Sequence, residues 1–244
     1  MPRFCALLSG GKDSNYALYR ALREGYEPAC ILVVRSERPD SWMFHTPHVD
    51  LALLQAEAMG LREKVVSARV SGVKEREVEE LYYALRRAHE EIGFDVIVVG
   101  ALASRYQYER IKRIADSLGV SVFAPAWQAD PEEYMRRIVS EGIRFIIIKI
   151  SVMGLPPRLL GVPIVGERLE EVLSLARKYG FHPAFEGGEA ETLVYDAPHY
   201  RARLCLEAER RTIAMYEHAL SIRRAWLSRD KNEKCIVVNG EITG

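Results

Sequence analysis

The N-terminal segment reads as a strand, a glycine-rich loop and a helix, and this order constrains the fold more than any other feature. An apolar run at residues 4–8 leads directly into Ser9-Gly10-Gly11-Lys12-Asp13-Ser14, and a helical pattern follows. Glycine lets the backbone turn tightly and approach a ligand, so consecutive N–H groups can face an anion. The N-terminal end of the helix and the side chain of Lys12 add positive charge. The segment therefore predicts a phosphate-binding unit.

The loop differs from the phosphate loop of pattern G-x-x-x-x-G-K-[ST]. That pattern requires a glycine and a hydroxyl where this chain has Ala6 and Asp13. A bare carboxylate would repel phosphates unless a divalent cation bridged them, so Asp13 indicates binding of a magnesium–nucleotide. The alternative interpretation is an ordinary glycine-rich turn with solvated ends.

Charge and hydropathy exclude several classes of protein. The 34 basic and 34 acidic side chains cancel, which removes the broad positive field of a nonspecific nucleic-acid binder, although a local basic patch stays open. The longest apolar runs are too short to cross a bilayer, and the N-terminus lacks a signal-peptide layout. We therefore expect a cytoplasmic protein without a membrane partner.

The cysteines and paired histidines do not form a metal-binding pattern. Cys5, Cys30, Cys205 and Cys235 show no C-x-x-C spacing and no histidines at zinc-finger distances, so we predict four thiols. His45 lies near a second histidine, but no further ligands complete a site. No structural zinc is predicted.

Apolar strands alternate with amphipathic helices up to about residue 123, which is typical of a parallel sheet with crossover helices. The predicted strands lie near residues 4–8, 30–34, 64–69 and 95–100. The last predicted helix of this part covers about 105–118 and ends at Gly119. Ligands of open parallel sheets bind beyond the carboxyl ends of the strands, so segments 9–14, 36–46 and 100–105 should converge.

The pattern changes after Trp127, where a second domain is expected to begin. It predicts a helix near 131–141, a buried strand at 144–150 and, beyond residue 201, antiparallel strands. We therefore expect a Rossmann-like α/β domain at residues 1–127 and a smaller α+β domain at residues 128–244.

A second dense motif, Glu186-Gly187-Gly188-Glu189-Ala190-Glu191-Thr192, gathers three carboxylates and a hydroxyl around a glycine pair. Close carboxylates repel one another unless they are solvated, protonated or facing a cation. If they are buried, a cationic substrate or magnesium is implied. The alternative is a surface turn with solvated acids.

SGGKDS resembles the PP-loop of the ATP pyrophosphatases, which cleave ATP to AMP and pyrophosphate while they activate a substrate oxygen. Taken with further motifs, most of the chain resembles the diphthine–ammonia ligase family, which performs the last step of diphthamide synthesis on translation elongation factor 2. These motifs are SGGKDSNYAL at 9–18, Met43-Phe44-His45-Thr46, Gln55-Ala56 with Gly60, Gly100-Ala101-Leu102-Ala103-Ser104, Tyr106-Gln107, Pro125-Ala126-Trp127, and EGGE…ET with Asp196.

The resemblance implies that a diphthine carboxylate attacks the α-phosphate of ATP and that ammonia then displaces AMP. It implies ATP and Mg²⁺, elongation factor 2 as the protein substrate, and free ammonium, since no glutaminase domain is evident. The implied nucleotide-binding residues are Ser9, Gly10, Gly11, Lys12, Asp13 as the magnesium ligand, Ser14, His45, Gly100 and Ser104. The implied catalytic residues are Lys12, Glu186, Glu189 and Glu191. The implied substrate-binding residues are Tyr106, Trp127, Phe185, Gly187, Gly188 and Thr192.

Two positions depart from the family pattern, and several interpretations stay open. Phe185 stands where the family usually has glycine, and Ala190 stands where it usually has an aromatic residue. We hypothesise that Phe185 supplies the lost ring surface, toward the trimethylammonium group of diphthine. The glutamates hold a cation or remove a proton as ammonia attacks.

Two other functions stay as alternatives, a tRNA-modifying PP-loop enzyme and a non-catalytic adenine-nucleotide sensor. Thiolating tRNA enzymes generally need catalytic cysteines, and no recognisable pair is present here. A sensor has no need of a triple-carboxylate second site. The oligomeric state is left open, with a homodimer among the alternatives.

Overall fold

The computed structural model describes residues 1–37, 49–73, 75–230 and 232–244, and it forms two units, residues 1–128 and 129–244. Each unit has its own sheet. His45, and most of the segment 36–46, lie outside the described residues.

The first unit is a five-stranded parallel sheet in the order β3-β2-β1-β4-β5, which is the strand order of a Rossmann fold. The predicted α/β class is therefore confirmed. The strands are β1 (Arg3–Leu7), β2 (Glu27–Ser36), β3 (Val65–Val70), β4 (Val96–Val98) and β5 (Ser121–Phe123). The helices are α1 (Lys12–Arg23), α2 (Val49–Ala58), α3 (Arg76–Ile92) and α4 (Arg105–Leu118), with a short 3-10 turn, η1, at Arg62–Lys64.

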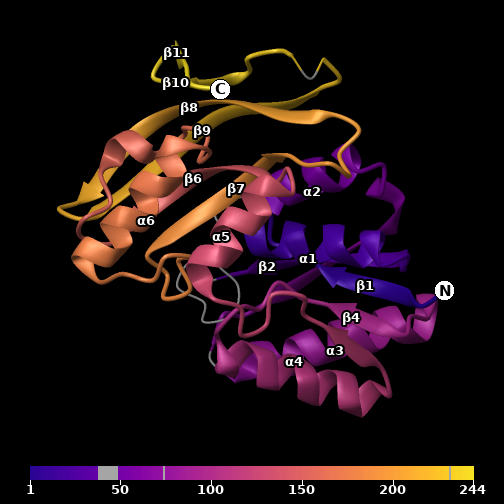
Figure 1. Cartoon of the computed structure of the whole chain (residues 1–244). Helices are drawn as coiled ribbons and strands as arrows, with labels where there is room; N and C mark the ends of the chain where they lie inside the picture. The colour runs from indigo at the N-terminus through magenta and orange to yellow at the C-terminus, as the bar shows by residue number, and fades with distance from the viewer. Residues whose placement is uncertain (38–48, 74, 231) are drawn as a thin grey trace. The chain divides into compact units, whose positions relative to one another are not determined.

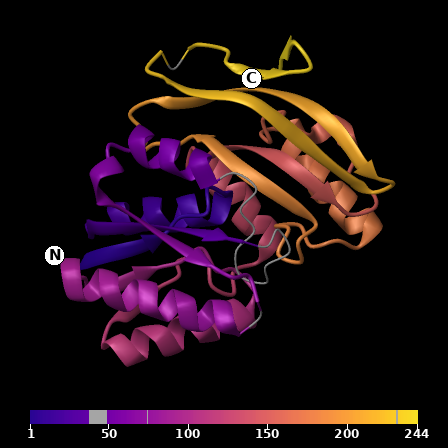
Figure 2. The same cartoon turned by 180° about the vertical axis from the view of Figure 1, so that it is seen from behind.

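Helices cover both faces of this sheet (Figures 1 and 2). On one face, α3 and α4 bury apolar side chains such as Leu81, Leu85 and Ile111 against the strands. Polar and charged residues occupy the other sides of these helices, so the 3.6-residue period itself decides which face is buried. Helix α4 begins at Ser104, whose side chain accepts a hydrogen bond from the Gln107 N–H, and it ends at the left-handed Gly119, as predicted.

The second unit is a six-stranded mixed sheet in the order β11-β10-β8-β9-β6-β7. Its elements are α5 (Pro131–Ser140), β6 (Arg144–Ser151), η2 (Pro157–Leu159), α6 (Glu167–Tyr179), β7 (Ala190–Asp196), β8 (Arg203–Ala214), β9 (Glu217–Ser228), β10 (Ile236–Val238) and β11 (Glu241–Ile242). Helices α5 and α6 pack against each other on one face, and β8 and β9 form a long hairpin (Figure 1). The sequence predicted α5, β6 and the antiparallel strands but missed α6 and β7.

The prediction of four thiols is wrong. Cys5 pairs with Cys30, and Cys205 pairs with Cys235, in two disulfides whose Cα atoms are 4.5 and 4.9 Å apart. Cys5 and Cys30 are register partners on the neighbouring strands β1 and β2. The second pair joins β8 to the residue before β10. Sequence spacing did not reveal these pairs because strand register, not distance along the chain, brings the sulfur atoms together.

Neither a membrane helix nor a cluster of metal-ligating side chains is found in the described ranges. No described helix is long and apolar enough to span a bilayer. Among the same residues, no group of three or more His, Cys, Asp or Glu side chains is arranged to hold a metal ion.

Candidate functional site

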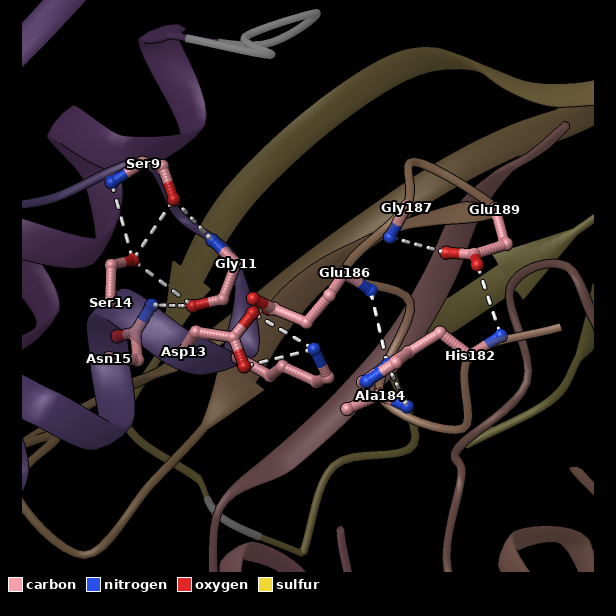
Figure 3. Close-up of polar contacts among 11 residues, drawn as sticks. Ser9, Gly11, Asp13, Ser14, Asn15, His182, Ala184, Glu186, Gly187 and Glu189 are labelled. Carbon is pink, nitrogen blue, oxygen red and sulfur yellow. Dashed lines mark hydrogen bonds and ion pairs between the residues drawn. The ribbon is translucent and has the colours of Figure 1, made fainter. Parts of the chain in front are cut away.

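The loop after β1 is closed by its two serines (Figure 3). The Ser9 N–H donates to Ser14 Oγ at 3.2 Å, and the two Oγ atoms are 3.1 Å apart. Ser14 Oγ also lies 3.2 Å from the carbonyl oxygen of Gly11, to which it donates. Gly10 has a φ of +91°, which favours glycine. The predicted glycines and serines therefore build one tight turn at the carboxyl end of the central strand.

Two buried amides, which the sequence analysis named only as parts of family motifs, hold the carbonyl groups of this loop. Gln55 Nε2 donates to the Gly10 carbonyl at 2.9 Å, and Asn15 Nδ2 donates to the Gly11 carbonyl at 3.0 Å. Both side chains are fully buried. The Gly11 N–H donates to Ser9 Oγ at 3.4 Å. These hydrogen bonds fix the peptide planes on both sides of Gly11. The motif Gln55-Ala56 was the available signal in the sequence.

Helix α1 begins in this loop without a side-chain cap. Its N-cap residue is Gly11, which has no side chain to cap the first turn. An N-terminus of this kind carries partial positive charge and can bind phosphate. The glycine-rich turn and the helix end therefore fit a nucleotide phosphate.

Lys12 and Asp13 form an ion pair at the start of α1. Lys12 Nζ lies 2.9 and 2.8 Å from the two carboxylate oxygens of Asp13. The Lys12 side chain is only 2% exposed, whereas that of Asp13 is 25% exposed. Magnesium in nucleotide sites is commonly held by one or two carboxylates together with phosphates and water. The partly exposed Asp13 carboxylate fits this requirement, and Lys12 is positioned to neutralise added negative charge.

Gly100, at the end of β4, packs directly against the loop. A Cβ atom at this position would collide with the backbone of Asp13 and Ser14. The sequence predicted a close approach of Gly100 to a nucleotide. The structure shows a close approach of Gly100 to the backbone of residues 9–14, which we call the phosphate loop. Two of the three predicted segments, 9–14 and 100–105, therefore meet at the switch point between β1 and β4.

The other predicted residues of the first unit have structural contacts of their own. The Tyr106 hydroxyl donates to Glu75 Oε1 at 3.1 Å, and the Arg110 guanidinium lies 3.3 Å from the centre of the Tyr106 ring. Partial burial, helped by the hydrogen bond to Glu75, raises the pKa of the Tyr106 hydroxyl. Trp127 stacks on Tyr108 with ring centres 4.1 Å apart. Substrate binding by Tyr106 and Trp127 stays a prediction.

In the second unit, residues 180–189 connect α6 to β7, and we call them the acidic loop. The carboxylate of Glu189 accepts hydrogen bonds from two backbone positions of this loop (Figure 3). Glu189 Oε1 accepts the His182 N–H at 3.0 Å, and Oε2 accepts the Gly187 N–H at 2.8 Å. A Cβ at Gly187 would approach Glu189 Oε1 to 2.7 Å, which explains the glycine. Gly188 has a left-handed φ of +82°. Glu189 thus shapes the loop by satisfying backbone donors.

His182, which the sequence prediction missed, supports the same loop from within. Its Nδ1 accepts the Ala184 N–H at 3.2 Å and the Glu186 N–H at 3.4 Å. Nδ1 therefore serves as a hydrogen-bond acceptor for two backbone donors of the loop. Glu186 is held through its backbone, and its side chain is partly exposed.

Glu191 is in a different environment, on the sheet. Lys149 Nζ lies 3.7 Å from Glu191 Oε1 and 3.5 Å from Glu217 Oε1, so one lysine from β6 joins carboxylates of β7 and β9. Glu191 Oε2 is buried and has no hydrogen-bond partner among the described residues. Thr192 follows on β7 and is partly exposed. The three carboxylates are therefore not equivalent, and no sequence pattern pointed to Lys149.

Phe185 is buried at the start of the acidic loop. Its side chain is 6% exposed and stacks on Phe181 with ring centres 6.3 Å apart. Its φ of +64° lies in the left-handed region, where glycine is favoured and other residues cost of order 1–3 kcal/mol. This backbone geometry gives a physical reason for a glycine at this position in the family pattern.

Comparison with known proteins gives matches along both units. The family model described as "Diphthamide synthase N-terminal domain" matches residues 2–122, and that described as "Diphthamide synthase C-terminal domain" matches residues 130–228.

Curated relatives cover most of this chain. The diphthine–ammonia ligase of Rattus norvegicus is 32% identical over 227 residues, which is 86% of this chain and 85% of the relative. That of Homo sapiens is 31% identical over 224 residues, 84% of this chain and 83% of the relative. The match to the Schizosaccharomyces pombe diphthine–ammonia ligase is 31% identical and covers 82% of this chain but only 35% of that longer protein.

A solved structure also resembles the chain distantly. It is described as a predicted subunit of a tRNA methyltransferase from Methanocaldococcus jannaschii, and it aligns with a TM-score of 0.41 and 17% identity over 80% of this chain and 96% of its own. Likeness at this level supports no conclusion about function.

Proposed function

This chain belongs to the diphthamide synthase family, and we propose that it is a diphthine–ammonia ligase, which amidates diphthine on translation elongation factor 2 with ammonium. The observation that carries the proposal is that the family's two domain models cover nearly all of both units. A single shared loop would support only nucleotide binding, whereas a match over the acidic loop extends the likeness to the substrate side.

The proposed reaction has two steps, because a carboxylate does not react usefully with ammonia. The diphthine carboxylate attacks the α-phosphate of ATP, which forms an acyl-adenylate and releases pyrophosphate. Ammonia then attacks the acyl carbon, loses a proton and displaces AMP, which leaves the amide. The protein mainly has to position the reactants and neutralise charge that develops on the leaving groups.

The phosphate loop is assigned to the first step. The backbone N–H groups of this loop at the start of α1, together with the hydroxyls of Ser9 and Ser14, would bind the departing pyrophosphate. Gln55 and Asn15 act through the loop as positioning residues, since their amides hold its carbonyls. Asp13 would hold Mg²⁺, which supplies charge neutralisation at the phosphates when bound. Lys12 adds a buried cation to the same end of α1.

The acidic loop is assigned to the cationic substrate. Glu186 and Glu191 are the carboxylates proposed to attract the trimethylammonium group or ammonium, because Glu189 already binds two backbone donors. We therefore assign Glu189 to positioning rather than to proton transfer. Removal of a proton from the attacking nitrogen falls to Glu186 or Glu191.

Product analysis tests the proposed function. Purified protein is incubated with magnesium-ATP and ammonium, with and without elongation factor 2 that carries diphthine. AMP and pyrophosphate should form only with that substrate. The mass of the modified side chain should fall by the difference between a carboxylic acid and its amide. Elongation factor 2 that lacks diphthine is the matched control. ATP bound but never cleaved would contradict the proposal and favour a nucleotide sensor, and cleavage with tRNA instead would favour a tRNA-modifying enzyme.

A further inference from the structure

Exposed apolar side chains gather at one end of the second unit. We call them the hairpin patch, which consists of Tyr179, Met215 and Tyr216. They line one pocket and are three of the nine large hydrophobic residues that are exposed in the described ranges, and Met215 is 78% exposed. Single exposed apolar residues are ordinary, but a contiguous group of them marks an interaction surface.

An open pocket lies within this patch, with a volume of about 280 Å³. It is lined by Val152, Leu155, Pro156, Pro157, Tyr179, Met215 and Tyr216, together with Gly154 and the polar side chain of His218. Gly154 shapes one wall, because a Cβ atom there would collide with the ring of Tyr179. The glycine therefore lets the tyrosine lie close against the backbone that follows β6.

The two residues at the turn of the β8–β9 hairpin are not of the types that favour tight turns. Ala214 pairs with Glu217, so Met215 and Tyr216 are the two turn residues (Figure 1). Tight hairpin turns favour Asn, Asp and Gly. Neither residue has the positive φ of the favoured turn types. Two large apolar side chains at an exposed tip contribute little to folding, which is consistent with selection for contact with another molecule.

The end of β6 connects the acidic loop to the pocket. Ser151 N–H donates to the Glu189 carbonyl oxygen at 2.8 Å, and the pocket wall begins at the next residue, Val152. On the other side, Glu217 of β9 pairs with Ser151 in the sheet, and Lys149 joins Glu217 to Glu191 of β7. The end of β6 thus lies beside these carboxylates and leads directly into the first wall of the pocket.

We propose that the hairpin patch is the docking surface for the protein substrate and binds an apolar segment of elongation factor 2 beside the diphthine side chain. This inference rests on the proposed function. A cationic side chain alone offers little area for recognition, whereas a protein-borne substrate brings a neighbouring surface with it. The patch supplies apolar area that becomes buried on binding, next to the carboxylates that receive the cation.

The test is a double substitution at the hairpin tip, Met215→Ser with Tyr216→Ser. Serine is compatible with turns, and both native side chains are exposed, so the hairpin is expected to remain. The KM for diphthine-bearing elongation factor 2 should rise about tenfold or more, as for loss of interface anchors. The KM for ATP and kcat should stay within about twofold of wild type. Matched controls are Ile242→Ser and Tyr83→Ser, which remove exposed apolar side chains outside the patch.

The possible failures are distinguishable. If wild-type protein does not amidate the substrate, the proposed function fails and this inference fails with it. If wild type is active and the double variant keeps its KM for the protein substrate, the docking surface is wrong and the proposed function stands. Light scattering adds a third outcome: a wild-type dimer that becomes a monomer in the double variant would show that a second copy of this chain occupies the patch, which also overturns the proposal.

Discussion

The phosphate loop and the acidic loop are both turns around a glycine pair, but they are held in different ways. The phosphate loop is closed by its own serines and is also held by Gln55, an amide from another helix 45 residues away from Gly10 in the sequence. The acidic loop is fixed from within the eight-residue span 182–189, by Glu189 and His182. Both departures from the family pattern, Phe185 and Ala190, fall in or beside the locally held loop.

The two loops should therefore differ in how they vary. A loop that is also held by a distant helix depends on the packing of the sheet as well as on its own residues. A loop that is held only by its own neighbours can change shape through one or two substitutions without changes elsewhere. The proposed nucleotide site is thus coupled to the fold, whereas the proposed substrate site is set locally.

The largest effect is expected from Lys12→Met, which keeps the buried volume but removes the charge. AMP formation should fall by about 10²–10³-fold, as for loss of one group that stabilises transition-state charge. The measurement is kcat with saturating protein substrate. A matched urea titration should show that the variant still folds. Activity within tenfold of wild type would mean that the phosphate loop does not act through Lys12.

Gln55→Leu tests whether the phosphate loop depends on its distant support. The substitution leaves the buried Gly10 carbonyl without its donor, which costs about 1–3 kcal/mol of stability. In a domain of this size each kcal/mol lowers Tm by about 2–4 °C. We expect a lower Tm and a raised KM for ATP, with the KM for the protein substrate unchanged. An unchanged Tm together with an unchanged KM for ATP would show that Gln55 does not support the phosphate loop. The two loops would then not differ in the way described above.

The sequence predicted the central strand–loop–helix unit well because its information is local. Glycines, hydroxyls and the helix start all lie within residues 9–14. It named Gln55 as a motif residue without a role, and it missed Lys149, because the roles of both depend on which strands and helices become neighbours. The same reason explains the wrong prediction for the cysteines: Cys5 and Cys30 meet through strand register.

From the sequence alone, three carboxylates of the motif at residues 186–192 were named without a division of their roles, and this was the limit of a composition argument. Like charges close together indicate a cation, but their spacing does not say which carboxylate accepts backbone hydrogen bonds. That division depends on the turn at Gly187 and Gly188 and on strand β7, which the sequence prediction missed. Site roles in this loop therefore required the three-dimensional hydrogen-bond pattern.

Glu189→Gln, compared with Glu191→Gln, tests the local support of the acidic loop. A glutamine side chain has one acceptor oxygen, and its NH2 group can only donate, so it can replace only one of the two hydrogen bonds that Glu189 accepts. The loop should therefore be less rigid. We expect the KM for the protein substrate to rise about three- to tenfold, equivalent to about one hydrogen bond. Hydrogen exchange at the His182 and Gly187 amides should become faster in the Glu189 variant only. Equal exchange in both variants would contradict the distinction between these glutamates.

Phe185→Ala is expected to have the smallest effect on the reaction, and it decides whether the departure from the family pattern concerns the substrate. If the ring faces the trimethylammonium group, its loss should raise the KM for diphthine-bearing elongation factor 2 by about two- to fivefold, since a cation–π contact at an accessible site is worth about 0.5–1 kcal/mol. Phe181→Ala is the matched control, because it removes the other ring of the same stack. If both variants lose stability and neither changes this KM, Phe185 serves packing, and its left-handed backbone is maintained by burial alone.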